Sequence, residues 1–215
     1  MPARDAAGMM LPILCTMDLV GVLVYRREVD WKVYAILIPG ALVGTLIGWV
    51  LSAHVSEAAV GLAVGIISLL FVLDAWVPIR KKLQEGVAPS RPWGVFWGAV
   101  AGFTSFISHT GGPPYQIYAV PLRLKPVVFA GTTAVFFATV NYAKLVPFYF
   151  LGQLSVANLE LAAALVPVGL FGMAAGVWLV KRVSPSVFYQ ITYVLILALA
   201  LDLIYEGVKG LWFTA

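Results

Sequence analysis

Charge is scarce in this sequence of 215 residues: Asp, Glu, Lys and Arg make up only 11% of it, while 61% is hydrophobic. An average soluble domain has about 25% charged and roughly 45–50% apolar residues. A soluble chain of this length would cover one core with charged side chains, but here the charges gather in short stretches between long apolar runs. The sequence therefore predicts an all-α, polytopic membrane protein whose apolar surface faces lipid.

Cysteine is also scarce. The single cysteine, Cys15, lies in an apolar run, so neither a disulfide framework nor a cysteine-based metal site is available. The net charge of +4 comes without a Lys/Arg stripe interleaved with aromatic residues, which argues against nucleic acid as a partner. We also expect no secretory signal at residues 1–5, because no small-residue cleavage site follows the first apolar run.

Motifs for nucleotide or hydrolytic chemistry are missing as well. The sequence has no P-loop, no GxSxG elbow, no HExxH pair and no carboxylate dyad. We therefore expect that this chain does not itself use ATP to drive transport, and that it binds no cofactor and no metal. The protein is predicted not to be an enzyme; an intramembrane enzyme that uses His109 with Ser105 or Ser108 is the weaker alternative.

Six apolar runs are long enough to cross a bilayer, which takes roughly 17–25 helical residues. They lie at 8–25, 33–52, 58–77, 126–149, 158–180 and 186–206. A further apolar stretch, 93–122, is cut by Thr110-Gly111-Gly112-Pro113-Pro114, where two prolines remove backbone donors and two glycines lower helical propensity. We expect a broken helix there.

The basic residues predict the orientation of these runs. Lys and Arg occur at 26, 27, 32, 80–82, 91, 123, 125, 181 and 182, whereas the loops 53–57 and 150–157 have none. The basic loops are placed on the cytoplasmic side. An odd number of membrane crossings must then separate the basic linker 78–92 from the loop 150–157. We therefore expect 93–122 to enter the membrane and return to the same side as a re-entrant hairpin. Its non-helical backbone should be shielded by protein or line a cavity.

An internal repeat divides the chain. Residues 37–56 align with 165–184 at a constant offset of 128, with eight of twenty positions identical, part of which is expected by chance in so apolar a sequence. The loops before the two copies differ in charge, which predicts an inverted-topology repeat. We therefore expect a first repeat at 1–77, a cytoplasmic linker at 78–92 and a second repeat at 93–215. The first repeat has no counterpart of the broken segment, so we expect a truncated or misplaced start, or a first half that works without one.

The break carries the densest polar cluster, from Ser105 to Gln116. Two half-helices that meet near the membrane midplane would aim unpaired N–H groups at one point, a partly positive site that suits an anion. The alternative is a packing kink. For His109 there are three interpretations: its side chain donates a hydrogen bond to an anion, relays protons, or bonds a backbone carbonyl in the break.

Two more polar features lie inside apolar runs. Asn141 and Lys144 are three residues apart and so share a helix face, although Lys144 could instead snorkel to the outer interface. Asp18 is the only acid between Met9 and Tyr25, and is a candidate proton or cation carrier unless it merely pairs with a lysine to fix packing. We assign no role to Asp74 and Asp202, which lie near helix ends.

These residues resemble a known family. The segment 108–114, followed by Gly131-Thr132-Thr133, Phe136-Phe137 and 141–144, is similar to the second repeat of the sulfite exporter family TauE/SafE. Leu11-Pro12-Ile13, Asp18, 25–27, Asp30-Trp31 and Pro39-Gly40 resemble its first repeat, so the likeness covers nearly the whole chain, although the glycine-rich first helix of that family is absent.

The resemblance implies a carrier of the bacterial inner membrane that exports sulfite, sulfonates or related small anions by alternating access. The alternative is an anion channel, which the sequence alone hardly distinguishes from a carrier. We expect the lipid bilayer and a small anion as partners, and a homo-oligomer is left open. The candidate substrate-binding residues are Ser108, His109, Thr110, Gly111, Gly112, Pro113, Gln116, Thr132, Asn141 and Lys144, with Asp18 and His109 as candidates for coupling.

Overall fold

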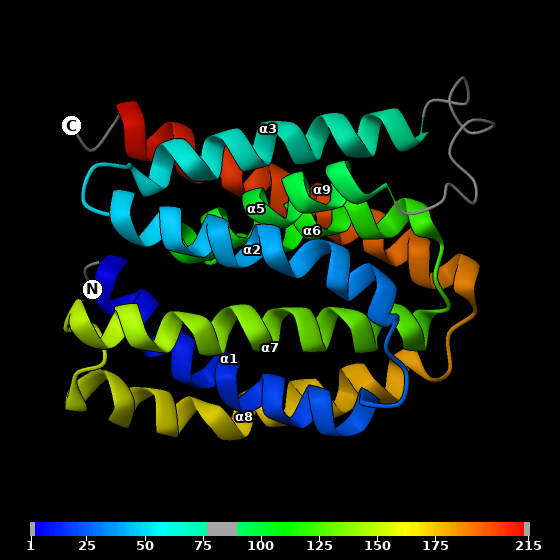
Figure 1. The fold of residues 1–215 in the computed structure, drawn as a ribbon, viewed down its shortest axis with the longest axis horizontal. Coiled ribbons are helices and arrows are strands. Elements are labelled where there is room, and N and C mark those ends of the chain that lie inside the picture. The colour runs from blue at the N-terminus through cyan, green and yellow to red at the C-terminus, as the bar shows by residue number, and fades with distance from the viewer. Residues whose placement is uncertain (1–2, 77–89, 213–215) are drawn as a thin grey trace. The chain divides into compact units, whose positions relative to one another are not determined.

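The computed structural model describes residues 3–76 and 90–212, which are helical with no strand (Figure 1). The helices are α1 (Ala3–Tyr25), α2 (Trp31–Leu51), α3 (Glu57–Trp76), α5 (Arg91–Ser108), α6 (Gly112–Ala119), α7 (Pro126–Phe150), α8 (Val156–Val180) and α9 (Pro185–Trp212), with a 3₁₀ turn, η1 (Val120–Leu122), after α6. The all-α prediction is confirmed for these residues.

Six described helices, α1, α2, α3, α7, α8 and α9, are long and apolar enough to cross a membrane. They coincide with the six predicted runs within a few residues at most ends, so the prediction of a polytopic helical protein is confirmed. The predicted linker 78–92 falls almost entirely on residues 77–89, which lie outside the described residues.

Polar and proline residues define several helix ends. The Asp30 carboxylate accepts hydrogen bonds from the backbone N–H groups of Lys32 and Val33, both at 3.0 Å, and so caps the start of α2. The Ser155 hydroxyl caps α8 in the same way, accepting from the N–H of Asn158 at 3.2 Å. Helices α7 and α9 begin with proline, whose missing N–H costs nothing at the first helical position.

The chain forms two compact units. The first unit contains residues 1–34 and 125–184, and the second contains 35–124 and 185–215. In the first unit α1 packs against α7 and α8; in the second α3 packs against α9, and α5 doubles back onto α6. Each unit therefore combines segments that are distant in sequence.

Glycines allow α2 and α5 of the second unit to approach backbone to backbone. A Cβ atom added to Gly40 or Gly44 would overlap the carbonyl of Val95 or Ala99 on α5. Reciprocally, Cβ atoms on Gly98 and Gly102 would overlap the carbonyls of Leu37 and Ala41 on α2. Such spacing of small residues is the usual way for membrane helices to gain close contact.

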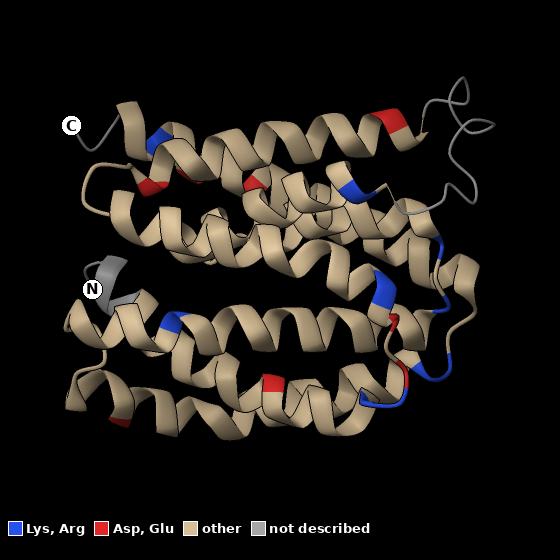
Figure 2. Cartoon of the chain, viewed as in Figure 1, with Lys and Arg blue, Asp and Glu red and all other residues tan. Residues whose placement is uncertain are grey.

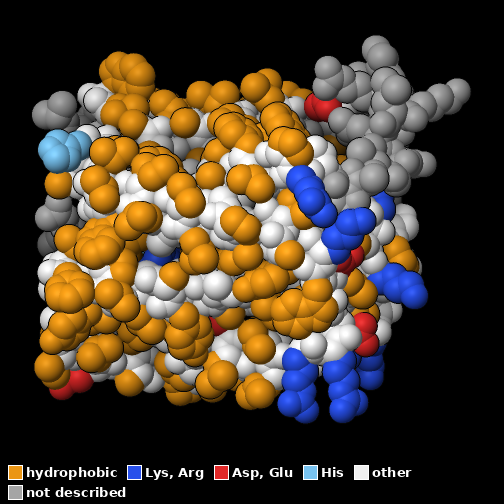
Figure 3. Space-filling model, in the orientation of Figure 1, with side chains coloured by type: hydrophobic (Ala, Val, Ile, Leu, Met, Phe, Trp, Pro, Cys, Tyr) orange, Lys and Arg blue, Asp and Glu red, His pale blue; other side chains and the backbone are white. Residues whose placement is uncertain are grey.

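Apolar side chains dominate the visible surface (Figure 3). Val168 and Phe171 on α8 are 69% and 79% exposed, and large apolar side chains are exposed on the other long helices too. Exposed apolar area of this extent is unfavourable in water but not in lipid.

Most of the described basic residues lie at one end of each unit, whereas Lys144 lies within α7 and Lys209 near the end of α9 (Figure 2). In the first unit Arg26 and Arg27 follow α1, Lys125 precedes α7, and Lys181 follows α8, all at the end where α1 and α8 finish and α7 begins. In the second unit the residues at the start of α5 and after η1 are basic. These are the same loop charges from which the orientation is predicted.

Candidate functional site

The predicted break is present between α5 and α6. Helix α5 ends at Ser108, and His109 takes the left-handed conformation with φ 55. This region is rare for residues other than glycine but more accessible to His, Asn and Asp. The left-handed residue ends the helix and redirects the chain, as in αL caps generally. The break thus begins at His109, two residues before the first of the glycines that predicted it.

Hydrogen bonds within the break hold its polar side chains. The hydroxyl oxygens of Ser108 and Thr110 are 2.7 Å apart. The Thr104 hydroxyl lies 3.3 Å from the Thr110 carbonyl, and the Thr110 N–H donates back to the Thr104 carbonyl. The segment is therefore a turn that is stabilised by hydrogen bonds between its own residues.

At the amino end of α6 few backbone N–H groups are available as donors, and they belong to glycines. Gly111 is the N-cap, Gly112 is the first helical residue, and Pro113 and Pro114 follow without N–H groups. The first later N–H, that of Tyr115, already donates to the Gly111 carbonyl at 3.2 Å. The partial positive charge of this helix end is thus presented through the N–H groups of Gly111 and Gly112.

Space and an unsatisfied polar atom accompany these donors. A Cβ atom added to Gly112 would meet no described atom within 4 Å. One turn further along, the carboxamide oxygen of Gln116 is buried and has no hydrogen-bond partner among the described residues. A carboxamide turned over presents N–H instead of oxygen at the same place, so Gln116 can serve either a donor or an acceptor.

A second polar cluster lies in the first unit, between α1 and α7. The Asn141 amide donates to the Asp18 carboxylate at 2.7 Å, and the Tyr142 hydroxyl donates to the Cys15 carbonyl at 3.3 Å. Lys144 has no exposed surface and lies within electrostatic range of Asp18. Its ammonium therefore does not reach the exterior of the described protein.

Thr132, also predicted as a site residue, is fully buried at the start of α7. Its hydroxyl donates to the Val128 carbonyl at 2.8 Å and accepts from the N–H of Asp30 at 2.9 Å. Thr132 thereby links α7 to the turn that starts α2. Gly131, beside it, faces the Glu28 carbonyl so closely that a Cβ atom would overlap it.

The predicted residues thus divide between the two units. Those of the segment 108–116 lie in the second unit, and Asp18, Thr132, Asn141 and Lys144 lie in the first. Sequence reasoning missed the contact of Tyr142 with Cys15, since no spacing rule relates residues on helices so far apart. Among residues 3–76 and 90–212, no three His, Cys, Asp or Glu side chains form a group that could hold a metal ion.

Comparison with known proteins adds one finding. The family model described as sulfite exporter TauE/SafE matches residues 1–203. No curated protein matches the chain, and no solved structure does.

Proposed function

This chain belongs to the sulfite exporter TauE/SafE family, and on that premise we propose that it is a secondary transporter that exports small sulfur-containing anions such as sulfite or organosulfonates. The family match and the six apolar helices support a multi-pass membrane protein that handles anions. The substrate, the outward direction and a location in the bacterial inner membrane are the narrower parts of the proposal.

The anion binds at the break between α5 and α6. The observation that carries this step is the amino end of α6, where Gly111 and Gly112 supply the available N–H groups and open space adjoins Gly112. Backbone N–H groups at a helix end suit an oxyanion, because the helix dipole adds to their partial charge. The surrounding side chains that complete the site are Ser108, His109, Thr110, Pro113 and Gln116.

The polar cluster of the first unit acts at a different point of the transport cycle. Asp18 and Lys144 are oppositely charged groups within membrane-spanning helices, where such groups are costly and are usually functional. Asn141 and Lys144 contact the anion during its passage, with Thr132 fixing the start of their helix. Asp18 and His109 are the groups through which a coupled proton would move.

Alternating access comes from movement of one repeat against the other. The offset of 128 relates α2 to α8. The loop before α2 is basic and the loop before α8 is neutral, which supports an inverted orientation of the two repeats. In the second unit both ends of the α5–α6 hairpin carry arginine, which supports entry and return from one side of the membrane.

The test of the anion site is sulfite efflux from proteoliposomes. Gly112→Leu fills the space beside the α6 donors, and we expect efflux to fall at least about tenfold, the effect of losing roughly 1.4 kcal/mol of binding free energy. Gly172→Leu is the matched control: it adds the same side chain on α8, where a Cβ atom also meets no described atom, and efflux should stay within twofold of native. Equal loss in both variants would refute a site at the break.

The same preparation separates a carrier from a channel. A carrier shows saturable uptake and counterflow of labelled sulfite, because each turnover returns one binding site across the membrane. Single-channel current steps without counterflow would instead identify an anion channel. Hydrolysis or modification of the test anion in detergent would contradict both.

A further inference from the structure

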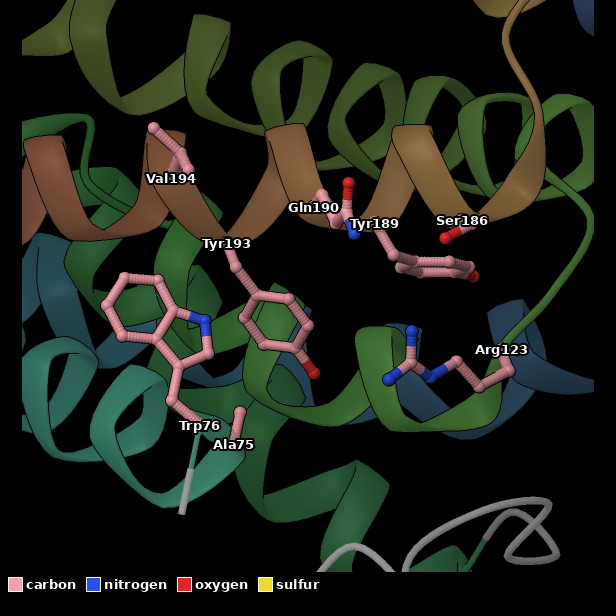
Figure 4. Close-up of a pocket in the computed structure, with 8 residues that line it drawn as sticks. All are labelled: Ala75, Trp76, Arg123, Ser186, Tyr189, Gln190, Tyr193 and Val194. Atoms are coloured by element: carbon pink, nitrogen blue, oxygen red, sulfur yellow. The ribbon is translucent and has the colours of Figure 1, made fainter. Parts of the chain in front are cut away.

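A pocket outside the proposed anion path lies in the second unit, at its basic end (Figure 4). Its volume is about 600 Å³, within the range of small-molecule sites. The end of α3 supplies Trp76, the start of α9 supplies Ser186 and Tyr193, and the turn after η1 supplies Arg123. In the sequence Arg123 indicates only the orientation of the chain, and the proposed anion path does not involve it.

Arg123 is held in place by aromatic rings and by its own backbone. Its guanidinium lies 4.8 Å from the ring centroid of Tyr189 and 5.9 Å from that of Tyr193, distances typical of cation–π contacts. The backbone of Arg123 is left-handed with φ 50, and its N–H donates to the Val120 carbonyl at 3.2 Å. The Tyr189 hydroxyl donates to the Leu124 carbonyl at 2.7 Å, which fixes the ring beside the turn.

The polar groups around the guanidinium are available to a ligand. No carboxylate among residues 3–76 and 90–212 forms an ion pair with Arg123. Within the same ranges, the side chains of Ser186, Gln190 and Tyr193 form no hydrogen bond that the structure records, and all three line the pocket. A guanidinium with neighbouring hydroxyl and amide donors matches a phosphate group, whose oxygens accept several hydrogen bonds at once.

The pocket lies where two membrane-spanning helices end. Trp76 is the last residue of α3, and Ser186 is the second residue of α9. Trp and Tyr side chains are typical of the level at which lipid headgroups meet the hydrocarbon. Val194, one turn deeper on α9 than Gln190, is 56% exposed and continues the pocket as an apolar wall.

We propose that this pocket binds the phosphate of an acidic phospholipid, with Arg123 as its anchor and Ser186, Gln190 and Tyr193 as partners of the headgroup. Both a lipid and free phosphate offer the same oxyanion. The lipid is favoured because the bilayer supplies it at high effective concentration beside α3 and α9, and because the apolar wall suits the start of an acyl chain.

The test measures lipid binding by native mass spectrometry of the full-length protein in detergent, titrated with phosphatidylglycerol or phosphatidylcholine. Native protein should prefer phosphatidylglycerol, and Arg123→Gln should weaken its binding roughly tenfold, because a charge-assisted contact is lost. Arg182→Gln is the matched control: Arg182 also stacks on an aromatic ring, Trp178, at 4.4 Å, but in the first unit. Its phosphatidylglycerol affinity should stay within twofold of native.

A second variant keeps the test valid if Arg123→Gln does not fold. Ser186 is exposed, so Ser186→Trp should fold while it fills the pocket, and it should weaken phosphatidylglycerol binding to a similar extent. Unchanged phosphatidylglycerol affinity in both variants would overturn the proposal. Displacement of the lipid by inorganic phosphate at equal concentration would overturn the lipid as occupant. Because binding is measured without transport, these outcomes are independent of the proposed export of sulfite.

Discussion

At the scale of single residues, Asp18 and Asn141 form a polar contact between two of the long apolar helices. The 2.7 Å hydrogen bond joins α1 to α7, and Lys144 lies within electrostatic range of the same carboxylate. Asp18 is partly buried, and a carboxylate in that position without a donor is costly, since the hydration that it loses is not replaced. Asn141 therefore stabilises the charge of Asp18 as well as the packing of its helix.

We expect Asn141→Leu to lower the free energy of unfolding by about 1–3 kcal/mol, because it leaves the Asp18 carboxylate without this donor. The measurement is denaturant unfolding in detergent. In an Asp18→Leu background the same substitution should cost less than half as much, since no carboxylate then needs the amide. Additive losses in the double variant would show that the hydrogen bond contributes nothing to stability.

At the scale of helices, the equivalent glycines of the two repeats have different surroundings. Gly44 on α2 touches the α5 backbone at Ala99, whereas Gly172, its counterpart on α8 at the offset of 128, has no described atom within 4 Å of an added Cβ. The sequence alignment treats the two positions as the same. Only the packing of α5 against α2 distinguishes them.

This difference predicts opposite responses to the same substitution. Gly44→Leu should destabilise the protein by at least about 1–3 kcal/mol, because the new side chain would force α2 and α5 apart. Gly172→Leu should change stability by less than about 0.5 kcal/mol, as is usual at open surface positions. Thermal unfolding in one detergent compares the two; a large loss for Gly172→Leu would mean that α8 is covered in the purified protein.

At the scale of the whole molecule, the loop charges predict an orientation. From these charges we expect the basic residues after α1 and α8 on one side of the membrane and the neutral loop between α2 and α3 on the other. The predicted sidedness can be tested at one residue of each loop.

Cysteine labelling tests this orientation directly, because the chain has a single, buried cysteine that can be replaced. In a Cys15→Ser background, Ala53→Cys should react with a membrane-impermeant maleimide added outside intact cells. Lys181→Cys should react only after the cells are opened. Both positions are exposed, so access is limited by the membrane alone. Labelling of both from the same side would contradict the inverted orientation of the repeats.

Local features of the sequence determined the six apolar helices and the break near Gly111, because hydrophobic length and the missing N–H of proline act within a few residues. Tertiary structure decided the rest. Asp18 meets Asn141 across 123 residues, and Arg123 meets Tyr189 across the whole of α7 and α8. Hydrophobicity in these helices is nearly uniform around the axis, so periodicity does not indicate which face packs against which neighbour. Side-chain contacts between distant helices supply that information, and the folded chain alone contains them.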